Sequence, residues 1–230
     1  MFLNASGAAV RGLLSLMLVL FSASLPSCRS TRGLGQAEPT GFLRDYSQLK
    51  KGERGEAQLV YINPATDFSQ YDSVMIDSVT LWRSGETSGI SPEDQQTLTD
   101  YLYAALHKQL SQDYEIVSNP GPGVLRVRAA VTEAKGAKVA ANVVTGVVPQ
   151  LRMATMAAGL ATNTAKFVGQ ASIEGEVTDS VSGERLLAAV DQRAGTKSPG
   201  TMFTKWGDVE KSFDFWAHRL RARLAELRGE

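Results

Sequence analysis

The chain has 230 residues, which is enough for one folded domain with a hydrophobic core. Hydrophobic residues make up 43% and charged residues 21% of it, as in an ordinary globular protein. The 24 Lys and Arg residues balance the 24 Asp and Glu residues, so the sequence lacks the basic excess of a nucleic-acid-binding protein. The single cysteine excludes an internal disulfide.

An uncharged apolar run follows Arg11 and ends at the only cysteine, Cys28. Its apolar core is shorter than the roughly 20 residues of a membrane-spanning helix and matches the central region of a signal peptide. The sequence Leu25-Pro26-Ser27-Cys28 resembles the lipobox of bacterial lipoproteins. This resemblance implies cleavage between Ser27 and Cys28 and lipidation of the Cys28 sulfur. An ordinary secretory signal or an uncleaved anchor is the alternative.

Residues 28–41 are rich in Gly, Ser, Thr and Gln, so we expect a flexible tether behind the lipidated cysteine. The residue after Cys28 is Arg29. Enterobacterial lipoproteins that stay in the inner membrane carry aspartate there. The resemblance therefore implies a lipid anchor in the outer membrane, on its periplasmic face. Residues 42–230 are then a single periplasmic domain.

The first half of this domain predicts a short helix or irregular lead-in at 42–55, then strands at 59–62 and 71–82. Residues 91–112 have leucines at helical spacing, with Ser91 as the N-cap and Pro92 at the first helical position. A short strand at 114–117 follows this helix. A turn rich in Pro and Gly separates it from the next strand, at 124–133.

The second half predicts a β-hairpin with strands at 166–178 and 184–193. In the first of them Glu174 and Glu176 alternate with apolar residues, which indicates one buried and one solvated face. Residues 208–227 form a helix with one apolar face, and Asp208 is its expected N-cap. The arginines of its last turns indicate a solvated helix end or, alternatively, a basic docking patch.

This order predicts an α+β protein, a two-layer sandwich of α/β type. We expect a mixed, mostly antiparallel sheet of about five strands, with both helices on one face. Residues 139–165 fit neither element, because they carry one charge, Arg152, among many small residues. We interpret them as an insert packed against the sheet or, alternatively, as a surface that meets lipid or another subunit.

The sequence contains no H-E-x-x-H, G-x-S-x-G or P-loop motif. Its S-x-x-K match, Ser47-Gln48-Leu49-Lys50, is not followed by S-D-N or K-T-G. His107 and His218 lie on different predicted helices without neighbouring ligands, so we expect no metal site and no cofactor. Four acids of the hairpin offer a carboxylate pair for acid–base chemistry on a sugar, but solvated surface is the expected role; they are Glu174, Glu176, Asp179 and Asp191.

The most distinctive polar and aromatic residues of the domain lie late in the chain. They are Asp191, Arg193, Trp206, Asp208 and Trp216. We interpret them as a cluster that either lines a binding groove or docks the last helix through an ion pair and aromatic packing.

Several segments resemble the bacterial lipoprotein family called domain of unknown function 3313. They are residues 167–176, Asp179 with Ser182-Gly183, residues 189–195, residues 206–209 and residues 215–217. The family implies an envelope lipoprotein and supplies no catalytic residues. The element order also resembles, more weakly, the periplasmic domain of the curli secretion channel lipoprotein. However, residues 139–165 lack the two long alternating strands of a pore hairpin.

These observations predict a non-enzymatic outer-membrane lipoprotein that acts as a structural or interaction module of the envelope. Its partners would be the membrane, through the lipid anchor, and other envelope proteins. A periplasmic binder of glycans or small molecules is one alternative. An oligomeric component of a secretion system or pore is the other, and the oligomeric state stays open.

Overall fold

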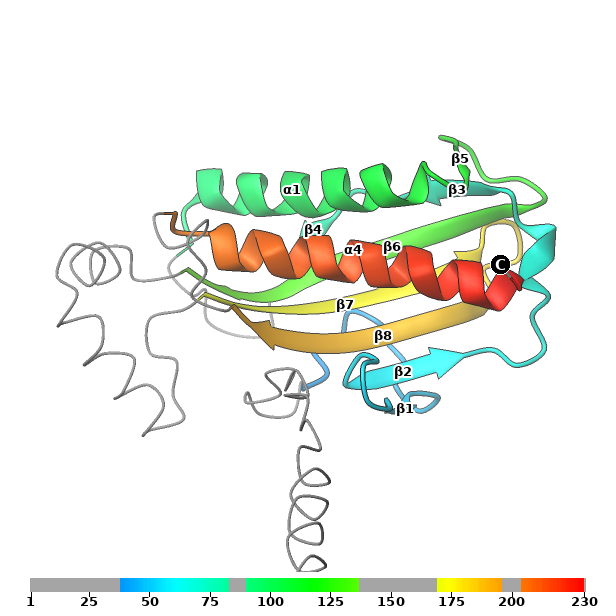
Figure 1. Ribbon diagram of the computed structural model, residues 1–230, viewed down its shortest axis with the longest axis horizontal. Helices are drawn as coiled ribbons and strands as arrows, with labels where there is room; N and C mark the ends of the chain where they lie inside the picture. Colours follow the sequence, from blue (N-terminus) through cyan, green and yellow to red (C-terminus); the bar gives the residue numbers. More distant parts are fainter. Residues whose placement is uncertain (1–37, 83–89, 137–168, 196–203, 230) are drawn as a thin grey trace, which may run out of the picture. The chain divides into compact units, whose positions relative to one another are not determined.

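The computed structural model describes residues 38–82, 90–136, 169–195 and 204–229. The insert at 139–165 and the whole signal and lipidation region, including Ser27 and Cys28, lie outside these residues. The described residues form one sheet with two long helices packed on one of its faces (Figure 1). The predicted α+β class is therefore confirmed.

The sheet has eight strands in the order β1-β2-β8-β7-β6-β3-β5, with β4 paired to β6. Their bounds are β1 Lys50–Lys51, β2 Leu59–Ile62, β3 Ser73–Ile76, β4 Thr80–Leu81, β5 Glu115–Ile116, β6 Val124–Lys135, β7 Gln170–Asp179 and β8 Arg185–Ala194. From β1 to β6 all neighbours are antiparallel, whereas β3, β4 and β5 join in parallel. The sheet is mixed, as expected.

The prediction of about five strands is wrong, because the sheet of the described residues has eight. Three of the eight, β1, β4 and β5, are only two residues long, which is too short to give a clear sequence pattern. The expected strand 71–82 is two strands, β3 and β4. Ile76 pairs with Val127 and Thr80 with Ala130, so four steps along one chain oppose three along β6. The extra residue interrupts the ladder as a bulge does.

Helix α1, Pro92–Leu110, begins as predicted. The Ser91 side chain accepts a hydrogen bond from the Asp94 N–H, and Pro92 opens the helix. Its leucines at spacings of three and four are buried against β3, β4 and β6. The short 3-10 helix η1, Phe68–Gln70, precedes β3.

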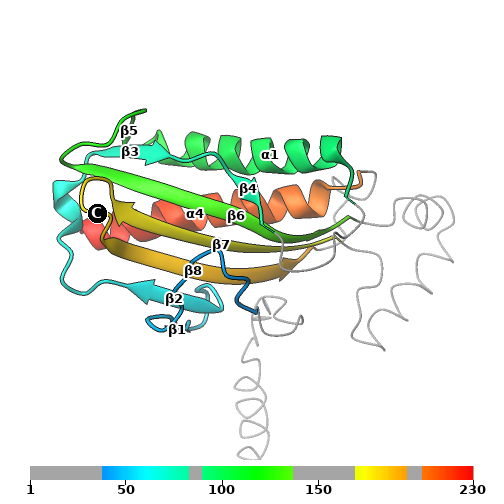
Figure 2. The ribbon, with the colours of Figure 1, turned by 180° about the vertical axis from the view of Figure 1, so that it is seen from behind.

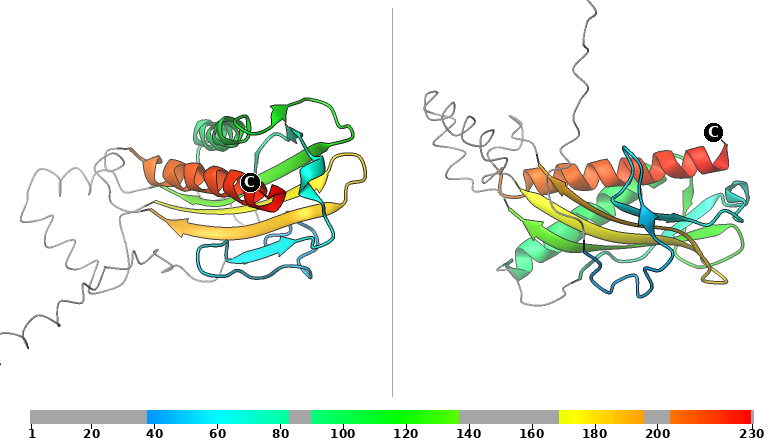
Figure 3. Two further views of the ribbon diagram at one scale, coloured as in Figure 1. Left: turned by 45° about the vertical axis from the view of Figure 1, so that its right-hand side comes forward. Right: turned by 90° about the horizontal axis from the view of Figure 1, so that it is seen from below.

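Helix α4, Gly207–Arg228, lies beside α1 and over β7 and β8 (Figure 3). The prediction that Asp208 caps this helix is wrong. Trp206 occupies the N-cap position without a side-chain bond, and the Gly207 N–H donates to Thr204 Oγ1. Asp208 is buried in the first turn, where its Oδ2 accepts the Gly169 N–H at 3.1 Å. It therefore ties the helix to the start of β7.

The sheet face opposite the helices is covered in part by the lead-in to β1, which is irregular (Figure 2). Phe42 and Leu43 pack there on Ala130, Ala188 and Val190. The expected solvated face is therefore a second small core, and the body is more than a simple two-layer sandwich.

Candidate functional site

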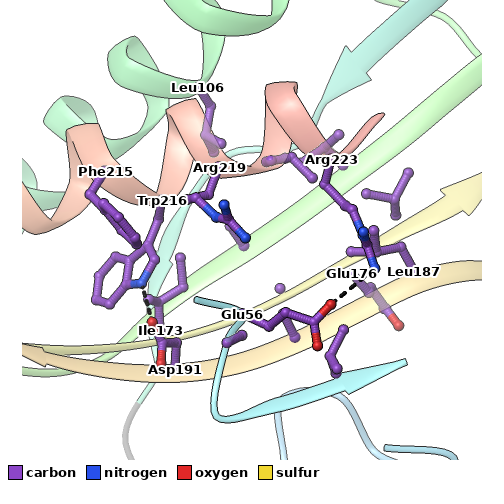
Figure 4. A pocket seen from close by; sticks show the side chains of 18 of the residues that line it. Glu56, Leu106, Ile173, Glu176, Leu187, Asp191, Phe215, Trp216, Arg219 and Arg223 are labelled. Carbon is purple, nitrogen blue, oxygen red and sulfur yellow. Dashed lines mark hydrogen bonds and ion pairs between the residues drawn. The ribbon is translucent and has the colours of Figure 1, made fainter. Parts of the chain in front are cut away.

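A cavity of about 140 Å³ lies between α4 and the sheet (Figure 4). Its walls come from α4, from the strands β2, β6, β7 and β8, from one α1 leucine and from the loop between β1 and β2. Apolar side chains make up most of its surface; they are Val60, Leu106, Val127, Ala129, Ile173, Val177, Leu187, Ala189, Phe215, Trp216 and Leu220.

The floor of the cavity is a row of small residues across three strands. Ala129 on β6 pairs with Gly175 on β7, which pairs with Ala189 on β8. All three line the cavity, so they lie below α4. None reaches beyond a Cβ atom, so at the present separation of helix and sheet these residues leave space between them.

The cavity lies where helix cover ends. Helices pack about 8–10 Å apart and strands about 4.8 Å, so two helices cover only about four strands. Beyond α4 the face continues to β2, and the loop residues Gly55, Glu56 and Ala57 close the cavity on that side. Glu56 Oε1 pairs with Arg223 of α4 at 3.0 Å. This ion pair joins the loop to the helix.

At one end of the cavity Asp191 joins α4 to the sheet. Its Oδ2 accepts the Trp216 indole N–H at 2.7 Å, and its Oδ1 accepts the Gln58 N–H at 3.2 Å. Asp191 and Trp216 are both buried. Two of the predicted cluster residues therefore meet directly, through a hydrogen bond between α4 and β8.

Arg193 lies two residues further along β8. Its guanidinium is 3.6 Å from the centre of the Phe215 ring. This is a cation–π contact between β8 and α4. Burial lowers the pKa of Arg193, and the charge of Asp191 opposes that shift. Arg193 therefore also helps to dock the helix, through stacking.

The other two cluster residues, Trp206 and Asp208, make separate contacts at the start of α4. The Trp206 indole N–H donates to Asp94 of α1 at 2.7 Å, and Asp208 accepts from Gly169. Neither residue lines the cavity. The predicted cluster is thus divided in two. Asp191 and Trp216 lie at the cavity, whereas Trp206 and Asp208 lie at the start of α4.

Arg219 was not among the predicted site residues, yet it lines the cavity from α4 (Figure 4). In the described part of the chain its guanidinium makes no hydrogen bond or ion pair, whereas Arg221 and Arg223 both have carboxylate partners. Sequence reasoning grouped all of them as one solvated helix end or, alternatively, as a basic docking patch. The only sequence signal for a role of Arg219 at the cavity is its spacing. Residues three or four apart lie on one helix face, and Arg219 is so placed relative to Trp216 and Arg223.

The prediction that Glu174 and Glu176 are solvated is wrong. Glu174 is fully buried and accepts hydrogen bonds from the Thr40 N–H and the Tyr46 hydroxyl, and burial with this contact raises the pKa of Tyr46. Glu176 lies between Arg128 and Arg185. These contacts fix the lead-in on the sheet.

Asp179, at the end of β7, accepts the Val181 and Ser182 N–H groups of the hairpin turn, and the Ser182 N–H is the main reason why the pKa of Asp179 is lowered. Asp191 lies on the helix-facing side of the sheet, where it lines the cavity, whereas Glu174 packs on the lead-in. The structure therefore does not bring the four acids of the predicted carboxylate group together.

Metal ligands do not converge among the described residues: no group of three or more His, Cys, Asp or Glu side chains there is placed to hold an ion. In the same residues, no helix is both long and apolar enough to cross a bilayer. The described part of the chain thus offers a partly open, mostly apolar cavity with charged groups among its lining residues.

The fold and this cavity define a single-sheet α+β protein with a helix layer on one face. Residues 38–220 match the family described as "Protein of unknown function (DUF3313)", and the chain belongs to this family. The uncharacterized lipoprotein YdcL of Escherichia coli strain K12 is 26% identical over 161 residues, which are 68% of this chain and 71% of YdcL.

Solved structures with a related arrangement include the PelC dodecamer from Paraburkholderia phytofirmans. It is 13% identical, with 70% of this chain and 94% of the PelC chain covered and a TM-score of 0.38. The hypothetical protein CT253 from Chlamydia trachomatis is 12% identical, with coverages of 68% and 99% and a TM-score of 0.43.

Proposed function

We propose that this protein is an outer-membrane lipoprotein, anchored through Cys28, whose folded body acts by non-covalent interaction rather than by catalysis. The observation that carries the anchor is the position of Cys28, the only cysteine, directly after an apolar run. The family match and the lipoprotein YdcL support the same function.

The roles of the polar residues in the body support a non-enzymatic function. Asp191, Glu176 and Asp208 each accept hydrogen bonds or ion pairs that join one element to another. A general acid or base must instead face a substrate with a free proton site. These carboxylates are structural, and the body would serve as an interaction module for other envelope proteins.

Metabolic labelling with an alkyne fatty acid tests the anchor. The full-length protein should take up the label and sediment with outer membranes, whereas Cys28→Ala should not be labelled. Label that persists in Cys28→Ala, or an unlabelled wild-type protein, would contradict lipidation at this residue.

The address is tested separately with Arg29→Asp. By the resemblance to enterobacterial lipoproteins, this variant should be labelled normally but remain in the inner-membrane fraction. Arg29→Lys is the matched control and should sort as the wild type does. If Arg29→Asp still reaches the outer membrane, the residue after Cys28 does not set the address.

Crosslinking in intact cells tests the interaction module. Defined crosslinked protein species are expected, and a protein that stays monomeric without partners would contradict it. The alternative of a secretion or pore component depends on residues 139–165, which lie outside the described residues, and stays a prediction.

A further inference from the structure

The backbone φ angle at the centre of the cavity floor is not one that requires glycine. Gly175, at the centre of its floor, is not among the glycines with positive φ. An added Cβ there would lie 3.3 Å from the Arg128 carbonyl oxygen and 3.9 Å from Ala129 Cβ. Alanine there would require the backbone of the neighbouring strand to shift by a few tenths of an ångström, whereas glycine fits without such a shift. The small residues have one visible consequence, which is the space below the helix.

The size of the space limits what fits into it. A dry apolar cavity of roughly 150 Å³ in another protein binds a benzene molecule. The cavity here measures about 140 Å³. Its floor is flat, because Ala129, Gly175 and Ala189 end at Cβ or earlier, and the aromatic residues Phe215 and Trp216 line its helix side. A single planar ring matches both the volume and the shape.

The charged groups at the cavity indicate which charge a bound molecule would carry outside its ring. Asp191 is satisfied by two N–H donors, and Glu56 is paired with Arg223. Arg219 is exposed, lines the cavity and makes no hydrogen bond or ion pair within the described residues. Figure 4 shows its guanidinium directed into the space between α4 and the sheet. It is a fork of donors that matches a carboxylate.

We propose that this cavity binds a small aromatic carboxylate, with the ring below α4 and the carboxylate on Arg219. The ring replaces empty space with apolar contacts to Trp216 and to the floor. The carboxylate stays at the margin, where it does not need to lose all of its water. A neutral compound of the same shape gains only an ordinary hydrogen bond from Arg219, and a cationic one is repelled by it. The proposal goes beyond the anchoring function and does not depend on it.

The test uses phenylacetate and its neutral isostere phenylacetamide, titrated calorimetrically into the full-length protein in phospholipid nanodiscs, with empty nanodiscs as the blank. We expect phenylacetate to bind at least about tenfold more tightly, because a charge-assisted bidentate contact is worth about that factor or more. Binding of neither compound would overturn the proposal.

Two variants separate the charge from the space. Arg219→Gln should bind phenylacetate and phenylacetamide equally, whereas the matched control Arg221→Gln, which does not line the cavity, should keep the preference. Ala189→Leu extends a side chain from the floor and should bind neither compound.

Thermal unfolding followed by circular dichroism checks that each variant is folded. If Ala189→Leu does not fold, Ala129→Val fills less of the space and takes its place. A preference that survives in Arg219→Gln, or full binding in a folded, filled variant, would place the ligand elsewhere and overturn the proposal.

Discussion

The indole N–H of Trp216 donates a 2.7 Å hydrogen bond to the carboxylate of Asp191, and this bond joins α4 to β8 inside the body. Both side chains are buried. The same carboxylate also accepts the Gln58 N–H from the chain that enters β2. One side chain thus joins the helix layer, a central strand and the loop that closes the cavity.

Removing either partner of this bond should destabilise the protein. An amide at 191 keeps one acceptor oxygen but turns an NH₂ group toward the other donor. We therefore expect Asp191→Asn to lower the free energy of unfolding by about 2 kcal/mol, since a buried donor then lacks a partner. Urea denaturation measures this loss.

A double-mutant cycle with Trp216→Phe isolates the bond itself. The two changes should be coupled by about 1–2 kcal/mol, because each removes the same hydrogen bond. Independent, additive losses would show that Asp191 acts mainly through Gln58 or through its charge.

On the opposite face, Glu176 should be more important for stability than its sequence position suggests. It is 7% exposed and accepts from Arg128 and Arg185. Arg185 also donates to the Leu43 carbonyl oxygen and so fixes the lead-in. Glu176→Gln should cost about 3 kcal/mol, because it leaves Arg185 without a carboxylate and Arg128 with only the longer contact to Asp77, at 3.9 Å.

Asp77→Asn provides the comparison for Glu176→Gln, since the main partner of Asp77, Arg126, is exposed. The second contact of Asp77, with Arg128, is longer, at 3.9 Å. Exposed pairs contribute about 0–1 kcal/mol. Equal losses of unfolding free energy in the two variants would mean that burial does not decide the contribution of Glu176.

The long elements could be predicted from sequence because their patterns are local. The leucines of α1 and the capping residue Ser91 lie within a few turns of one another. The burial of Glu174 could not be predicted in this way. Its alternation is that of a solvated strand, and its partners Thr40 and Tyr46 lie more than 120 residues away. The contacts that bury it exist only after the chain has folded back.

The cavity was missed for a related reason. Ala129, Gly175 and Ala189 are unremarkable in sequence and form a row only when the strand register is known. That register shifts at irregularities between Val131 and Glu133 and between Val177 and Thr178. A displacement of one residue would turn the row to the other face. Side-chain patterns do not reveal such irregularities.

Acid should weaken the contact between α4 and the turn after α1. Arg221 makes two hydrogen bonds with Asp113, at 2.6 and 2.9 Å, and these are the main reason why the pKa of Asp113 lies below its ordinary value of 3.8. The carboxyl group of Asp113 therefore binds its proton more tightly in the unfolded chain than in the folded one. The stabilisation is fully present above about pH 4 and is lost as the pH falls through the lowered pKa.

Asp113→Asn tests this linkage. At pH 7 we expect the variant to unfold with about 1 kcal/mol less free energy than the wild type. The difference should shrink as urea denaturation is repeated at decreasing pH below 4. A difference that stays constant down to pH 2 would assign the contribution of Asp113 to packing instead of charge.

The start of α4 is close to the sheet because two glycines leave room for Asp208. A Cβ atom added at Gly195 would lie 2.2 Å from Asp208 Cβ, and one added at Gly169 would lie 3.0 Å from it. Gly195→Ala should therefore force α4 away from the end of β8 and cost about 1–3 kcal/mol of unfolding free energy. Gly169→Ala should cost less, since its contact is longer.

Urea denaturation of both variants checks this order. A Cβ atom added at Gly195 would also lie 2.3 Å from Asp208 Cγ and 2.8 Å from its Oδ1. Asp208→Ala removes these two contacts and keeps the one with Cβ, so it should rescue Gly195→Ala only in part. Asp208→Gly removes all three and should recover more of the loss, apart from its own helix cost of about 1 kcal/mol. Full rescue by Asp208→Ala would show that the carboxylate, and not the approach of the helix backbone, sets the need for glycine at 195.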